Sequence, residues 1–302
     1  MVITITGQDE ETIMQYEDGA KLDPSQVGGG GGGRRGGGIA IGGGGAIVVV
    51  ILALIFGFDP SAILGGDSQQ RADPGGGQST LQNCQSVEDI EKDRNCRYVA
   101  YTNSIQAYWE TKLEGYQVTK INPVSGQVST ACGQASSEVG PFYCPEDQQV
   151  YLDIDFLDQL LSQLGAQGGD AAEAYVLAHE FGHHVQNLTG VMAEAQRDRS
   201  TGPKSAGVRL ELQADCLAGT WFANEKNIAD SPIGDFTEQD LAAAVDAARA
   251  VGDDHIQEQS GGGVNPDGWT HGSSEQRKHW LQIGYSTGDP NKCDTFSTDD
   301  LG

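Results

Sequence analysis

The stretch DAAEAYVLAHEFGHHVQNLTG, residues 170–190, decides the fold of this chain. Apolar side chains recur along it at helical intervals, and Gly190 follows them as a typical helix stop. Asp170 and Glu173 have the spacing of an N-cap residue and the third residue after it. The stretch therefore predicts one long helix that begins at Asp170 and ends before Gly190.

The centre of this predicted helix reads HEFGH, residues 179–183, which is an H-E-x-x-H pattern. Two imidazoles four residues apart are rotated by only about 40° around a helix, so His179 and His183 can reach one metal ion. Glu180 follows the first histidine, where its carboxylate can accept a proton from a water molecule at the metal. The pattern predicts zinc ligands at His179 and His183 and a catalytic general base at Glu180.

A second predicted helix carries LELQADC at residues 210–216, in which Glu211 and Asp215 lie four apart. Glu211 is the predicted third zinc ligand, and Asp215 is predicted to orient an imidazole by accepting its second N–H. A shell of two histidines and one glutamate leaves one position open on one Zn²⁺ per chain. The alternative is that both carboxylates belong to a solvated face of this acidic protein.

His271 precedes Ser273 and Gln276, which have the spacing of a capping pair at the start of a helix. A side chain at such a helix entrance can face a cleft. We therefore predict a catalytic role in which His271 donates a hydrogen bond to the oxyanion formed when water attacks a peptide carbonyl. A surface histidine is the alternative.

The remaining histidines are not expected to bind the metal. His184 comes directly after the second ligand and should point away from it, as a polar or core-edge residue. His279 is expected on a helix surface, and His255 belongs to a capping turn or an ion site. Gln186 and Thr189 stand where a metzincin has glycine and histidine, which excludes that class of zinc peptidase.

The chain before residue 78 has a different character. Residues 39–58 contain no charged side chain and match one bilayer crossing. We expect four segments: a disordered, glycine-rich cytoplasmic segment (1–38), a transmembrane helix (39–58), a flexible linker (59–77) and an extracytoplasmic catalytic domain (78–302).

The charges around the apolar stretch predict its orientation. Arg34 and Arg35 precede it, whereas Asp59 follows it, so the positive-inside tendency places the N-terminus in the cytoplasm. The expected protein is anchored in the cell membrane by a single span, with its catalytic domain outside. A cleaved secretory signal and a twin-arginine export signal are the alternatives.

All six cysteines follow the apolar stretch, and an even count in an exported domain suggests disulfides. Fifteen pairings are formally possible. Sequence proximity favours these pairs: Cys84 with Cys96, Cys132 with Cys144, and Cys216 with Cys293.

The catalytic domain is predicted to be α+β, mainly helical with a small β-sheet. Further helices are expected at residues 86–113, 206–224, 238–251 and 274–285. Residues 150–156 alternate between apolar and polar and predict a strand. This strand could align an extended peptide beside the catalytic helix, although an ordinary buried strand has the same pattern.

Composition limits the partners of this domain. A formal net charge of −25 makes nucleic acid and anionic lipid surfaces poor bulk partners. The sequence carries no signal for an oligomeric state. A peptide or protein is the expected substrate, and residues 39–58 are the expected membrane contact.

Four motifs occur in order along the chain: GPFYCP (140–145), HEFGHHVQ (179–186), RLELQADC (209–216) and THGSSEQR (270–277). Together they resemble the bacterial putative neutral zinc metallopeptidase family over roughly residues 80–296. The resemblance implies a membrane-tethered, zincin-like domain of the gluzincin type. It also implies that His179, His183 and Glu211 match the ligand positions and that Glu180 matches the catalytic position.

These observations predict a membrane-anchored zinc endopeptidase that hydrolyses peptide bonds with metal-activated water and Glu180 as the general base. An alternative from another class is a membrane-tethered binding or scaffold protein whose zinc site is structural or inactive. An intact Glu180 argues against it, because a structural site needs no general base and usually has four protein ligands. A third reading, hydrolysis of an amide or ester in the cell wall, uses the same site.

Overall fold

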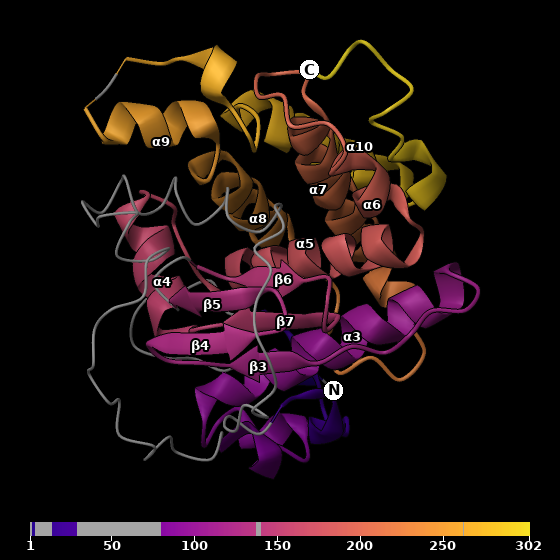
Figure 1. Ribbon diagram of the computed structural model, residues 1–302. Helices are drawn as coiled ribbons and strands as arrows, with labels where there is room; N and C mark the ends of the chain where they lie inside the picture. Colours follow the sequence, from indigo (N-terminus) through magenta and orange to yellow (C-terminus); the bar gives the residue numbers. More distant parts are fainter. Residues whose placement is uncertain (1, 4–13, 29–79, 137–139, 262) are drawn as a thin grey trace.

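Helix α5 (Asp170–Leu188) lies at the centre of the structure and packs against α3, α6, α7, α8 and β6 (Figure 1). The computed structural model describes residues 2–3, 14–28, 80–136, 140–261 and 263–302. The other helices are α3 (Arg97–Lys112), α4 (Ile154–Gln163), α6 (Val191–Ala195), α7 (Ala206–Asn224), α8 (Glu238–Ala250), α9 (Asp253–Gln259) and α10 (Ser274–Thr287).

The strands are short: β1 (Val2–Ile3), β2 (Tyr16–Glu17), β3 (Ile121–Pro123), β4 (Gln127–Thr130), β5 (Gly133–Ser136), β6 (Phe142–Cys144) and β7 (Gln149–Leu152). The 3-10 turns are η1 (Pro24–Gln26), η2 (Thr80–Asn83), η3 (Val87–Asp89), η4 (Arg94–Cys96), η6 (Glu225–Asn227), η7 (Pro266–Gly268) and η8 (Pro290–Lys292). The fold is therefore α+β and mainly helical, as the sequence predicts.

The helices α7 and α10 cross so closely that only glycine fits at their contact. A Cβ atom at Gly284 of α10 would lie 1.9 Å from the carbonyl oxygen of Cys216 in α7, and one at Gly219 would lie 2.2 Å from that of Leu281.

Three disulfides link Cys84 to Cys96, Cys132 to Cys144 and Cys216 to Cys293. This pairing confirms the one that sequence proximity favours.

The strand predicted at residues 150–156 is wrong in its second half. Strand β7 ends at Leu152, because the carboxylate of Asp153 accepts a hydrogen bond from the backbone N–H of Phe156 and caps helix α4. Strand β7 also lies in the middle of its sheet, parallel to β3 and antiparallel to β6. It therefore has no free edge for a peptide, and the edge strand nearest α5 is β6 (Figure 1).

The helix expected at residues 86–113 is shorter than predicted. Two 3-10 turns, η3 and η4, precede α3, which begins at Arg97.

The start of α5 also differs from the prediction, because Gly169 is its N-cap residue and Asp170 is its first helical residue. Asp170 and Glu173 do not form a capping pair with each other; they accept hydrogen bonds from Arg94 and Arg97, at 2.6 Å in each case.

The prediction of disorder for residues 1–38 is wrong for residues 14–28. Met14, Tyr16, Leu22 and Val27 belong to the same buried core as α3, α5 and α7. The expected membrane span (39–58) and linker (59–77) lie outside the described residues. Among the helices of the described part of the chain, none combines the length and apolar character that a bilayer crossing requires.

Candidate metal centre

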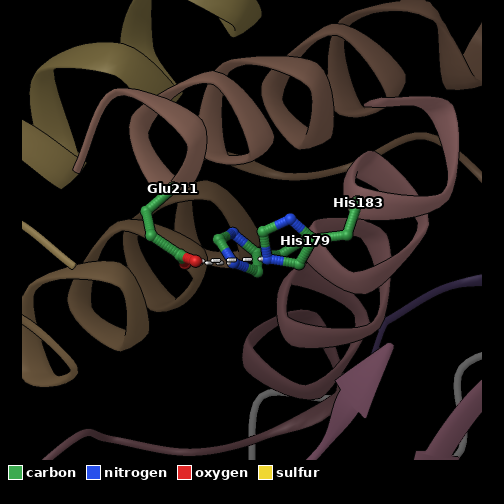
Figure 2. A group of neighbouring side chains, drawn as sticks. All are labelled: His179, His183 and Glu211. Atoms are coloured by element: carbon green, nitrogen blue, oxygen red, sulfur yellow. Dashed lines mark hydrogen bonds and ion pairs between the residues drawn. The ribbon is translucent and has the colours of Figure 1, made fainter. Parts of the chain in front are cut away.

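The site lies where α5 and α7 cross. Gly182 of α5 faces Ala214 of α7, and a Cβ atom at Gly182 would lie 3.0 Å from the Cα of Ala214. The absence of a side chain at this position lets the two backbones approach. As a result, the histidine face of α5 meets the face of α7 that carries Glu211 (Figure 2).

Three side chains point toward one another at this crossing (Figure 2). The Nε2 atom of His179 lies 3.1 Å from Oε2 of Glu211, and Nε2 of His183 lies 3.5 Å from Oε1 of the same carboxylate. One ligand atom from each residue lies within 4.8 Å of the others. Ligand atoms about 2.1 Å from a tetrahedral zinc ion lie about 3.4 Å apart, so this donor set fits zinc in both chemistry and spacing.

Each imidazole is held through its other nitrogen. The Nδ1 atom of His179 lies 2.8 Å from Oδ1 of Asp215, and Nδ1 of His183 lies 2.9 Å from Oε1 of Gln186. Gln186 is itself fixed, because its Nε2 donates to the carbonyl oxygen of Leu210 at 2.7 Å. These acceptors favour a proton on each Nδ1 atom, which directs both Nε2 lone pairs toward Glu211.

Asp215 lies at the centre of a buried polar network. Arg277 of α10 donates to both oxygens of Asp215, at 2.9 Å each, and the hydroxyl of Tyr175 donates to Oδ1 at 2.6 Å. Asp215 is fully buried. Burial alone would raise the pKa of Asp215, but the positive charge of Arg277 and the contact with His179 hold it below its ordinary value. The carboxylate is therefore charged and fixed in orientation.

The pKa values of the two glutamates of the site are shifted in opposite directions. Burial opposes ionisation of Glu211, but His183 and His179 hold its pKa well below its ordinary value. Burial raises the pKa of Glu180 above its ordinary value, although both histidines oppose this effect. A carboxylate with a raised pKa is a better proton acceptor near neutral pH, which suits a general base.

His271 lies in the loop before α10 and is held by Asp253. One oxygen of Asp253 accepts hydrogen bonds from the backbone N–H groups of Thr270, His271 and Gly272, and the other lies 3.4 Å from Nδ1 of His271. His271 is one of the charges that lower the pKa of Glu211. The capping pair of Ser273 and Gln276 is confirmed. The role of His271 toward an oxyanion stays a prediction.

The other histidines have separate places. His184 is fully buried between the hydroxyl of Tyr143 and the carbonyl oxygen of Gln117, at 2.9 and 2.6 Å, so it belongs to the core. His279 is exposed on α10, as predicted. His255 contacts the carbonyl oxygen of Leu164 at 2.8 Å and belongs to none of the candidate metal groups of the described residues.

The sequence analysis missed three residues that orient the site. Tyr175 precedes His179 by one helical turn, and Gln186 follows His183 by three residues, so helix periodicity alone places them beside the histidines. Arg277 ends the THGSSEQR motif. Its contact with Asp215 depends on the packing of α10 against α7, which no local pattern predicts.

Comparison with known proteins gives one family and several relatives. The family model described as "Putative neutral zinc metallopeptidase" matches residues 14–296. "Uncharacterized protein Rv2575" of Mycobacterium tuberculosis and "Uncharacterized protein Mb2605" of Mycobacterium bovis are each 50% identical, over 96% of this chain and 100% of the relative. "Uncharacterized protein YpfJ" of Escherichia coli is 43% identical over 60% of this chain and 62% of its own length. No solved structure matches.

Proposed function

Because the chain belongs to the putative neutral zinc metallopeptidase family, we propose that it is a zinc-dependent endopeptidase that hydrolyses peptide bonds in protein substrates. The observation that carries this proposal is the convergence of His179, His183 and Glu211, with one ligand atom of each within 4.8 Å of the others. We propose that these three side chains hold one Zn²⁺ ion. Zinc in such a site would act as a Lewis acid and would lower the pKa of a water molecule toward about 7.

The protein's own side chains transfer the proton, orient the ligands and bind the oxyanion in this proposal. The carboxylate of Glu180 accepts the proton of the attacking water and later donates it to the leaving amine. Asp215 and Gln186 keep the rings of His179 and His183 in the orientation that ligation needs. His271 is proposed to donate to the oxyanion, since its backbone is fixed by Asp253 at the entrance of α10.

Strand β6 is the proposed place for the substrate backbone. It forms one edge of the sheet, and edge strands bind extended peptides through main-chain hydrogen bonds. The hydroxyl of Tyr143 in β6 contacts Nδ1 of His184 and the side-chain amide of Asn187, at 2.9 Å each. These contacts fix β6 against the turn of α5 that carries His183. An extended peptide segment is therefore the proposed substrate form.

The test uses the purified full chain, loaded with one equivalent of zinc, and an unfolded protein substrate whose fragments are identified by mass spectrometry. We expect hydrolysis that a chelator abolishes and added zinc restores. Glu180→Gln should retain zinc and lower the hydrolysis rate by about 10²–10⁴-fold, because it removes the proton acceptor. Glu194→Gln, at an exposed position on α6, is the matched control and should be fully active.

Two results would contradict the proposal. A zinc-loaded protein that cleaves no unfolded substrate would favour the scaffold alternative. A Glu180→Gln variant that hydrolyses at the wild-type rate would remove this residue from the mechanism.

A further inference from the structure

Residues 14–28, here called the N-terminal strap, are part of the folded domain. Their backbone is hydrogen-bonded to two distant segments: Leu22 N–H donates to Gln85 O at 2.9 Å, Val87 N–H to Ala20 O at 3.1 Å, and Gly28 N–H to Ile121 O at 2.7 Å. Four strap side chains, Met14, Tyr16, Leu22 and Val27, are at most 6% exposed. Removing these apolar side chains from water stabilises the docked strap.

The strap also contacts the first residue of the helix that carries the site. The hydroxyl of Tyr16 donates to Oδ2 of Asp170 at 3.1 Å and lies 3.3 Å from the hydroxyl of Tyr101. The region matched by the family model begins at residue 14, where the described strap begins. The strap thus contacts α5, and the family model includes it together with the catalytic domain.

The described residues that flank segment 29–79 lie side by side. The side-chain amide of Gln82 donates to the carbonyl oxygens of Pro24 and Val27, at 3.1 and 2.7 Å. Leu81, two residues after the segment, is buried in the same core as Val27. The chain therefore leaves the domain at Gly28 and returns to it at a neighbouring point.

A chain that leaves and returns to one folded body must cross a bilayer an even number of times. One crossing takes about 20 apolar residues, so two crossings need about 40. Between residues 29 and 79, only residues 39–58 form an uncharged stretch of that length. A single crossing at residues 39–58, as the sequence predicts, is therefore incompatible with a docked strap.

From these contacts we infer that the N-terminal strap and the catalytic domain occupy the same side of the membrane. This arrangement replaces the two-sided one expected from the sequence, in which the N-terminus is cytoplasmic and the domain is outside. The inference does not depend on the proposed peptidase activity.

Thiol labelling of the full chain tests this arrangement. All six native cysteines are paired in disulfides, so Asp18→Cys in the strap and Glu114→Cys in the domain, both at exposed positions, each add one free thiol. Spheroplasts that express each variant are treated with a membrane-impermeant maleimide before or after lysis, with the wild-type chain as the background control. We expect the two thiols to behave alike, either both reactive in intact spheroplasts or both reactive only after lysis. Opposite behaviour would overturn the inference.

Hydrogen exchange of the membrane-bound full chain provides a second, independent readout. The amides of Leu22, Gly28 and Val87 donate across the strap–domain contact, so we expect them to exchange slowly. Fast exchange at Leu22, Gly28 and Val87 would show that the strap is undocked and would also overturn the inference.

Discussion

The Nδ1 atom of His179 lies 2.8 Å from Oδ1 of Asp215, which joins the candidate zinc ligand on α5 to a buried carboxylate on α7. Arg277 extends this contact to α10 by binding both oxygens of Asp215. Three helices from distant parts of the chain thus determine the orientation of one imidazole ring. The precision of the site depends on this network as well as on the residues expected to touch the metal.

Removing the charge of Arg277 should therefore weaken the metal site. Arg277→Met leaves Asp215 as an unpaired buried charge, which we expect to cost about 3–5 kcal/mol of unfolding free energy. Zinc affinity should fall by about 10–100-fold, as for other partners that orient a ligand. Arg277→Lys retains one charged donor and should restore part of the zinc affinity. Competition with a coloured chelator and urea unfolding measure the two effects, and unchanged zinc affinity in Arg277→Met would contradict this role.

The close crossing of α7 and α10 should tolerate no side chain at Gly284. Gly284→Ala would place a methyl group 1.9 Å from the carbonyl oxygen of Cys216, so the helices must separate. We expect a loss of at least about 1–3 kcal/mol of unfolding free energy, as for overpacked cores. Gly207→Ala, near the start of α7, is the control because its nearest contact is 3.6 Å away. It should be neutral or stabilising by up to about 1 kcal/mol. Equal stability of the two variants would refute the close crossing.

Glu225 should make stability depend on pH independently of the site. Burial raises the pKa of Glu225 to about 7, although hydrogen bonds from Ser104 and Ser231 oppose this effect. An unfolded chain releases this proton near pH 4.3, so between about pH 4.3 and 7 the folded state binds the proton and the unfolded state does not. The free energy of unfolding therefore falls as pH rises through this window, by about 3.7 kcal/mol in total.

Glu225→Gln keeps a neutral side chain at every pH and should remove this component. Relative to wild type, its unfolding free energy should rise by about 2.5 kcal/mol between pH 5 and pH 8. Glu258→Gln changes an exposed carboxylate and serves as the control. Urea unfolding at several pH values measures the difference. A constant difference between Glu225→Gln and wild type across this range would contradict a raised pKa.

Local patterns in the sequence predicted the helices that carry the site. Helix α7 has the expected bounds, residues 206–224, and α10 begins at the expected Ser274. The spacing of HEFGH and LELQADC also anticipated that His179, His183 and Glu211 would meet. The helix bounds and the shared face of His179 and His183 depend on helix periodicity within about 20 residues, where residue spacing determines which side chains share a face. The position of Glu211, on another helix, follows from the family resemblance instead.

Features that depend on contacts between distant segments were not predictable. The strap has no periodic pattern, and Tyr16 is buried because it meets Asp170, more than 150 residues away. The prediction that Asp170 is a capping residue is wrong because its partner, Arg94, lies 76 residues away, where residue spacing carries no information. The predicted end of β7 is wrong because the alternation of apolar residues continues past Leu152 into the first turn of helix α4.

X-ray absorption at the zinc edge tests the central claim most directly, because it identifies the ligands of the bound ion. For the full chain with one equivalent of zinc, we predict two imidazole nitrogens at about 2.0–2.1 Å, oxygen in the other positions and no sulfur. In His183→Ala the imidazole signal should fall and most of the zinc should be lost on dialysis. A wild-type spectrum without imidazole, or a His183→Ala variant with the wild-type spectrum and affinity, would contradict the zinc site.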